Sequence, residues 1–161
     1  MKDGEFIVRT IDYITGGSEL LEFVRPLWNL LNEHHQINSM YFSDRYRNLD
    51  FDTRKKKFMT DTNKELRIDL VKDVERQVFI GYCISTVTID FVGEIDSLYI
   101  EPDYRKFGIG HQLMELALEW LDRKNVKTKI IGVAEGNEEV FDFYSKYGFF
   151  KKTTILEQVK N

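Results

Sequence analysis

The residues of this chain best suited to chemistry gather between residues 94 and 111. Arg105 and Lys106 stand just ahead of Gly108 and Gly110, and apolar residues then recur at helical spacing. A helix start presents unpaired N–H groups and the positive end of its dipole, and glycine there lets an anion approach the backbone closely. The stretch therefore predicts a site for a phosphate or diphosphate, to which the two cations add charge pairing.

Two other phosphate-binding loops do not fit this stretch. A Rossmann fingerprint would need a third glycine, and a Walker loop would need Gly-Lys followed by Ser or Thr; neither is present after Gly110. The structural alternative is that Gly108 and Gly110 only permit a tight turn between a strand and a helix.

Two carboxylates lie upstream of the glycines. Glu94 is eleven residues before Arg105, on the strand that should lead into the loop, and Asp96 follows two residues later. Strand alternation would place both on one face. An amine acceptor is protonated at neutral pH, so a carboxylate, or a water held by one, could take its proton. The alternative is that these acids cap a sheet end or only bind the charge of an amine.

Two motifs together resemble a known family, the GCN5-related N-acetyltransferases (GNAT). Arg105-x-x-Gly108-x-Gly110 resembles the acetyl-CoA-binding signature of that family. The run from Asn137 to Phe143-Tyr144-Ser145-Lys146-Tyr147-Gly148-Phe149 resembles its second motif. The resemblance covers roughly Val78 to Val159, and the first 77 residues only weakly.

The resemblance implies one acyl-CoA N-acyltransferase domain over residues 1–161, with acetyl-CoA as co-substrate and no metal. The backbone N–H groups of residues 107–111 would hold the pyrophosphate, and the main chain of Leu98 and Ile100 would bind the pantetheine arm. The residues expected to contact the cofactor are Leu98, Tyr99, Ile100, Arg105, Lys106, Phe107, Gly108, Ile109, Gly110, His111, Asn137 and Phe143.

The resemblance also implies catalytic roles. Tyr144 would be the general acid that protonates the leaving thiolate, because a thiol has a pKa of about 8.5 and a phenol of about 10. Glu94 resembles the base position of the histone-modifying branch of the family, and Asp96 is the second candidate. For Tyr144 the alternative is core packing, because apolar residues recur around it at helical spacing.

The remaining reactive residues favour structural roles. Cys83 lies in an apolar strand pattern without an evident base, which predicts core packing. The adjacent histidines His34 and His35 are expected at the surface or on the substrate side, because no cluster with metal-ligand spacing surrounds them. The basic run 54–57 is expected to be a solvated face, with a lesser role at the 3′-phosphate of the cofactor.

Composition excludes several function classes. The chain has 161 residues, of which 42% are hydrophobic, and no apolar run approaches the ~18 residues that span a bilayer. Its net charge of −4 argues against nucleic acid as a partner and weakly favours amines. With the single cysteine Cys83, no internal disulfide can form, which favours the cytoplasm.

The fold expected is a mixed α/β one. Its main feature is a mostly antiparallel twisted sheet of about seven strands with helices on both faces, as in GNAT proteins. Strands are expected at 5–15, 66–71, 77–88, before the glycine loop, at 129–134, near 149–150 and at 154–159. Helices are expected after Ser18, at 53–59, after the glycine loop and at 137–147.

Two points of this fold stay open from the sequence. Pro26 either kinks the first helix or opens a second segment. The strand expected after Phe149 would carry an exposed edge that could pair with a second copy to give a homodimer.

The function expected is transfer of acetyl from acetyl-CoA to a primary amine, by direct attack in a ternary complex. A small-molecule amine is the expected acceptor. The alternatives are a protein amine (lysine or N-terminus) and a non-catalytic acyl-CoA-binding or sensing module. The acceptor should be chosen by residues 32–62 and by the face at 91–96. Neither the identity of the acceptor nor the length of the acyl group can be read from the sequence.

Overall fold

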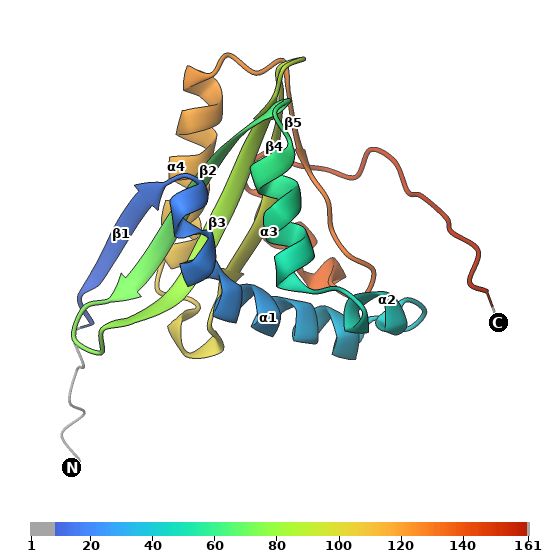
Figure 1. Ribbon diagram of the computed structural model, residues 1–161, viewed down its shortest axis with the longest axis horizontal. Helices are drawn as coiled ribbons and strands as arrows, with labels where there is room; N and C mark the ends of the chain where they lie inside the picture. Colours follow the sequence, from blue (N-terminus) through green and yellow to red (C-terminus); the bar gives the residue numbers. More distant parts are fainter. Residues whose placement is uncertain (1–8, 161) are drawn as a thin grey trace, which may run out of the picture.

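A five-stranded sheet forms the centre of the protein, whose structure is a computed structural model that describes residues 9–160 (Figure 1). The strands lie side by side in chain order, the first four antiparallel and the fifth parallel to the fourth. They are β1 (Ile11–Gly16), β2 (Lys64–Asp73), β3 (Val78–Thr88), β4 (Val92–Ile100) and β5 (Thr128–Ile131). The expectation of a mixed, mostly antiparallel sheet is confirmed.

Helices cover both faces of the sheet, as predicted (Figure 1). The α-helices are α1 (Leu21–Asn38), α2 (Ser43–Arg47), α3 (Phe51–Thr60), α4 (Ile109–Arg123) and α5 (Phe141–Ser145). Short 3-10 turns, Ser18–Leu20, Pro102–Tyr104 and Glu138–Val140, precede α1, the glycine loop and α5. None of the helices between residues 9 and 160 is long and apolar enough to cross a membrane.

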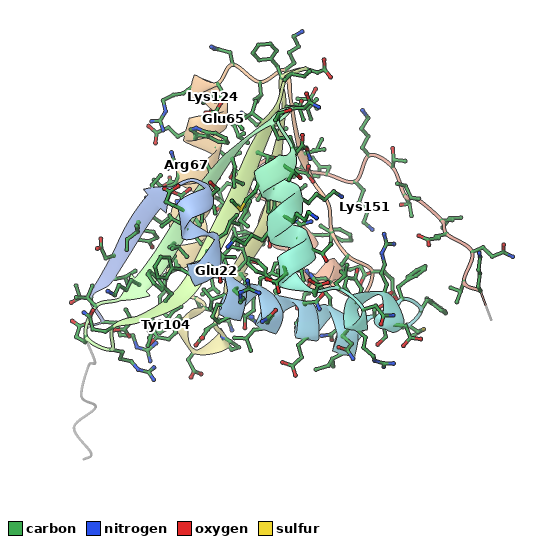
Figure 2. The ribbon with its side chains drawn as sticks, viewed as in Figure 1. Glu22, Glu65, Arg67, Tyr104, Lys124 and Lys151 are labelled. Carbon is green, nitrogen blue, oxygen red and sulfur yellow. The ribbon has the colours of Figure 1, made fainter. Side chains whose placement is uncertain are left out.

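The core has two halves because the middle strands are buried on both faces. On one face Leu113, Ala117 and Leu121 recur every four residues along α4, and each is fully buried. On the other face Val24 and Leu27 of α1 are buried against the sheet. An ion pair also joins α4 to β2, because Lys124 Nζ lies 2.6 Å from Glu65 Oε1. Figure 2 shows this pair at one end of the molecule.

Pro26 lies inside a continuous helix. α1 runs through it without a break, although proline has no N–H to donate to the preceding turn. Buried residues stand on both sides of it, Leu21 and Val24 before and Leu27 and Trp28 after. The burial of this apolar face explains why the helix continues past Pro26.

β4 carries the irregularity that shapes the site. Ser97 pairs with Ile84 of β3 and Ile95 pairs with Ser85, so Asp96 has no partner and forms a bulge. The bulge reverses the alternation of side chains. Ile95 packs in the α4 half of the core, whereas Ser97 faces the α1 half, where the Tyr82 hydroxyl lies 2.6 Å from its Oγ.

The two expected strands at the C-terminal end are absent, so the expectation of about seven strands is wrong for residues 9–160. From residue 149 to residue 160 the chain has no strand, and nearly all of it is exposed. A strand requires a neighbour for its backbone groups, and this part of the chain finds none on its own sheet. At the other end, β1 begins at Ile11, and residues 5–8 of the expected strand lie outside the described residues.

The close pairing of β3 and β4 allows a test by substitution. Gly81 pairs with Ile100, and a Cβ at Gly81 would lie 2.9 Å from the backbone oxygen of Tyr99. Gly81→Ala should lower the free energy of unfolding by about 1–3 kcal/mol, because the end of β4 must shift.

Gly132 offers the matched control, since a Cβ there meets nothing within 4 Å. Gly132→Ala should change the free energy of unfolding by less than about 0.5 kcal/mol in urea titrations. Equal losses in the two variants would contradict the close contact at Gly81.

Candidate active site

A pocket opens where β4 and β5 part. The two strands pair only from Val92 with Thr128 to Ile95 with Ile131, and beyond that point no strand of residues 9–160 pairs with β4 on this edge. The pocket between them has a volume of about 320 Å³. It is lined by Trp28, Leu31, Asn32, His35, Tyr46, Leu49, Asp50, Thr53, Arg54, Lys57, Ile95, Asp96, Ser97, Leu98, Ile131, Gly132, Val133, Ala134, Asn137, Val140 and Tyr144.

The glycine loop starts α4, as predicted. Gly108 is the residue before the helix and has a φ of +79°, which favours glycine. The N–H of Gln112 donates to its carbonyl at 3.0 Å, so the N–H groups of residues 109–111 precede the first bond of the helix. The start of this fifteen-residue helix can therefore receive an anion.

Gly110 brings this helix start close to the pocket. A Cβ at Gly110 would lie 3.3 Å from Ile100 Cδ1 and 3.3 Å from Phe143 Cζ. Phe143 is followed by Tyr144, which lines the pocket. The start of α4 thus lies close to Phe143, the residue next in sequence to one that lines the pocket.

Arg105 fastens the loop to the end of β4. Its Nε donates to the carbonyl oxygen of Ile100 at 2.9 Å, and its guanidinium lies 5.7 Å from the ring centre of Tyr99. Lys106 and Phe107 are exposed, and Lys106 has a φ of +66°. Lys106 is therefore freer than Arg105 to meet an anion.

Tyr104 anchors the other side of the loop (Figure 2). This residue is buried, its hydroxyl donates to Asp73 Oδ2 at 2.6 Å, and it accepts from Arg76 Nη1 at 3.0 Å. The hydrogen bond from Tyr104 holds the pKa of Asp73 below its ordinary value. Sequence reasoning did not single out this network, which ties the loop to the turn between β2 and β3.

Asp96 is held by a cation. Arg54 of α3 forms an ion pair and hydrogen bond with Asp96, whose side chain is only 12% exposed. The Arg54 guanidinium also lies 4.8 Å from the ring centre of Phe58. The expected solvated face at residues 54–57 is therefore wrong for Arg54, which lines the pocket.

Glu94 lies beside this pair without lining the pocket itself. Burial, and then the negative charge of Asp96, raise the pKa of Glu94, while Lys64 and Arg54 act in the opposite direction. A carboxylate with a raised pKa is a stronger proton acceptor than an exposed one.

Tyr144 lies on α5 and lines the pocket. Burial raises the pKa of its hydroxyl, with a smaller contribution from Cys83. The phenol is therefore protonated at neutral pH. The pKa of Tyr144 therefore lies further above that of a thiol than the ordinary value of about 10 for an exposed tyrosine would place it.

The second motif is held from both sides. Asn137 Oδ1 lies 3.3 Å from His34 Nε2 of α1, and no side-chain capping bond is formed at its 3-10 turn. The Tyr147 hydroxyl lies 2.7 Å from His111 Nδ1 of α4. The residues predicted around the cofactor thus fall into two groups, one at the start of α4 and one at the pocket.

The structure adds pocket residues from the N-terminal helices that the sequence did not identify. Arg54 could have been found, because Phe51, Arg54 and Phe58 recur at helical spacing and so share a face. His35 lines the pocket with its Nδ1 buried and without a hydrogen-bond partner. Cys83 is fully buried, which confirms its predicted core role, and burial raises its pKa to about 12.

Known proteins resemble this chain in sequence. The model of the acetyltransferase (GNAT) family matches residues 31–149. An uncharacterized N-acetyltransferase of Methanocaldococcus jannaschii is 29% identical over 72 residues, which are 45% of this chain and 32% of that protein. One of Archaeoglobus fulgidus is 41% identical over 54 residues, 34% of this chain and 37% of that protein. The matched part of the chain thus spans about a third of these curated relatives.

Solved structures share the fold. Aminoglycoside N-acetyltransferase AAC(6′)-Iy in complex with CoA superposes with a TM-score of 0.64 at 15% identity, over 94% of this chain and 95% of that one. The same protein bound to the bisubstrate analogue CoA-S-monomethyl-acetylneamine gives a TM-score of 0.62 at 14% identity, over 94% and 99%. At these identities the likeness shows the fold alone.

The positive charge of Arg54 should lower the pKa of Glu94. Arg54→Met should raise the pKa of Glu94, because the positive charge that now lowers it is removed. The carboxyl ¹³C chemical shift of Glu94, followed by NMR through a pH titration, measures the change.

Lys57→Met is the control, since Lys57 lines the same pocket from the same helix without contributing to the pKa of Glu94. An unchanged pKa of Glu94 in Arg54→Met, or an equal rise in the control, would contradict the assignment.

Proposed function

Because this chain belongs to the acetyltransferase (GNAT) family, we propose that it transfers the acetyl group of acetyl-CoA to a primary amine on a small molecule. The observation that carries this proposal is the pocket at the parting of β4 and β5. Asp96 and Tyr144 line it, Glu94 lies beside Asp96, and Gly110 at the start of α4 lies near Phe143, the residue before Tyr144.

The residues present fit acetyl-CoA. The N–H groups at the start of α4, together with exposed Lys106, suit a diphosphate. The main chain of β4 beyond Ile95 has no strand partner on the pocket side, so Leu98 and Ile100 can offer backbone groups to a pantetheine arm. Acetyl-CoA supplies a thioester that an amine can attack, with CoA leaving as the thiol.

Glu94 is proposed to take the proton of the amine through a water molecule. Asp96 lines the pocket, but its carboxylate is engaged in an ion pair and hydrogen bond with Arg54, so it is not free to hold a water for the amine. Glu94 lies behind it with a raised pKa. Removal of the proton of a lysine-like amine at neutral pH costs about 4–5 kcal/mol, so such a base is useful.

Tyr144 is proposed to return a proton to sulfur. Its hydroxyl is protonated and lines the pocket. Because its pKa is raised well above that of a thiol, the transfer requires negative charge to build on sulfur as the C–S bond breaks.

A small-molecule acceptor is supported by the size and position of the pocket. Its volume of about 320 Å³ is at the lower end of small-molecule sites. α1, α2 and α3 surround its acceptor side, and the α1–α2 connection is tied across to the chain after β5 by the hydrogen bond from Met40 N to Glu135 Oε1, at 3.0 Å. The bisubstrate complex of AAC(6′)-Iy is consistent with a small amine.

Two alternatives are separated by one assay. A panel of small amines, peptides with free N-termini and lysine peptides is tested for release of free CoA thiol. Release with small amines only supports the proposal, and release with peptides favours a protein acceptor. Binding of acetyl-CoA with no release in any sample favours a sensing module. The cytoplasmic location expected from the single cysteine stays a prediction.

Tyr144→Phe should lower kcat by about 10²–10⁴-fold while the Kd of acetyl-CoA changes little, because only proton donation is lost. Steady-state kinetics and calorimetry separate the two effects. Tyr13→Phe is the control, because Tyr13 lies on β1 at the opposite edge of the sheet from β5 and does not line the pocket, and it should keep turnover near the wild-type value. Unchanged turnover in Tyr144→Phe would remove Tyr144 from the mechanism.

The proposed role of Glu94 as a base predicts that kcat/KM depends on pH. The carboxylate accepts a proton only when ionised, so kcat/KM should fall as the pH drops through its pKa, which burial raises above the ordinary value of about 4.3. Glu94→Gln should lower kcat and abolish this acidic limb. If Asp96→Asn abolishes it and Glu94→Gln does not, Asp96 is the base.

A further inference from the structure

The acceptor side of the pocket carries polar side chains that the proposed reaction does not use. Glu94 and Tyr144 account for the two proton transfers. His35 of α1 and Lys57 of α3 line the same pocket without a part in either transfer. Their charges and hydrogen-bonding groups therefore bear on which amine the pocket accepts.

Within residues 9–160, four charged side chains line the pocket, and three of them are engaged by the protein itself. Asp96 is paired with Arg54. Asp50 caps α3, since its Oδ1 accepts from Thr53 N at 2.8 Å and its Oδ2 accepts from the Thr53 hydroxyl at 2.8 Å. The fourth, Lys57, forms no ion pair with a carboxylate of the described chain. Its charge is therefore available to a ligand.

Two nitrogen atoms of pocket-lining residues also lack partners. His35 Nδ1 and Arg54 Nε are buried and make no hydrogen bond within residues 9–160. Burial lowers the pKa of His35, so its ring is neutral at neutral pH and keeps one N–H, while Arg54 Nε can only donate. A buried donor without a partner is unfavourable. A ligand oxygen that either nitrogen reaches by a small side-chain rotation would be stabilised there.

Lys57 lies one helical turn from the reactive side of the pocket. Arg54 and Lys57 are three residues apart on α3, so they share a face, with their Cβ atoms about 5–6 Å apart. Arg54 contacts Asp96 of β4, and Glu94 lies on the same strand. A ligand whose amine lies near these carboxylates can therefore place a second group near Lys57.

We propose that the acceptor resembles an amino acid, in that it is a primary amine that also carries a carboxylate. The carboxylate pairs with Lys57, and the ammonium group lies on the side of Glu94 and Asp96 before it loses its proton. A carboxylate supplies both a negative charge for Lys57 and oxygen atoms for the unpartnered nitrogens. This acceptor class rests on the proposed function, because an amine must react in this pocket.

The same charges disfavour a diamine. The pocket-lining residues carry two positive charges, on Arg54 and Lys57, and two negative charges, on Asp50 and Asp96. A molecule with one charge of each sign suits such a lining. The second ammonium group of a diamine would instead approach Lys57, and like charges repel.

Matched substrates test the proposal. Glycine, β-alanine and γ-aminobutyrate are each compared with their carboxamides, and kcat/KM is divided by the fraction of free amine because the carboxamide lowers the pKa of the amine. The wild-type protein should prefer the carboxylate about tenfold in at least one pair, the effect of one charge-assisted hydrogen bond. The diamine that matches the preferred amino acid in chain length should react more slowly than that amino acid.

Lys57→Met should remove this preference by raising KM for the amino acid about tenfold. Lys56→Met is the matched control, because Lys56 is the adjacent residue of α3, carries the same charge and does not line the pocket. It should keep the preference. Equal kcat/KM within every pair, or the same preference in Lys57→Met as in the wild type, would overturn the proposed acceptor class and leave acetyl transfer to amines standing.

Binding separates that result from a failure of the proposed function. If no amine is acetylated, the proposed function is wrong, and calorimetry on CoA-saturated protein still measures the pairing. The amino acid should bind Lys57→Met about ten times more weakly than the wild type. An equal Kd in the two proteins, or no binding to the wild type, would overturn the pairing with Lys57.

Discussion

The parting of β4 and β5 after four paired residues is the constraint on which the rest of the site depends. It coincides with the bulge at Asp96, which adds a residue to β4 and reverses its side-chain alternation. Without the bulge Ser97 would share the face of Ile95, and the strand would continue to pair regularly. With the bulge, backbone groups of β4 and the carboxylate of Asp96 turn toward the opening between β4 and β5. Buried polar groups in such an opening need a ligand or water as a hydrogen-bond partner.

The residues around the opening include the two groups proposed to move protons. Arg54 is paired with Asp96, and burial raises the pKa of the neighbouring, half-buried Glu94. On the α5 side burial keeps the Tyr144 hydroxyl protonated. The same physical cause, removal from water, raises both pKa values, so one group is made a better base and the other a reluctant acid.

Much of this arrangement could be predicted because it depends on local signals. Gly108 and Gly110 mark a helix start by their lack of side chains, and strand alternation identified β2 and β3 to within a few residues. The ion pair of Arg54 with Asp96 joins residues 42 apart in sequence, and no local pattern specifies such a contact. The prediction of the two final strands was wrong for a related reason. β-propensity is a property of a single residue, whereas a strand also requires another strand to pair with.

The separation of β4 and β5 that forms the pocket leaves β5, at the edge of the sheet, weakly supported. Because β5 must turn away from β4 to leave the pocket, it is only four residues long and has one neighbour. Short two-stranded pairings are weak by themselves. The strand that forms one pocket wall is thus the shortest of the sheet, and it pairs with β4 alone within the described residues. The pocket and the weak support of β5 are therefore consequences of the same break in pairing.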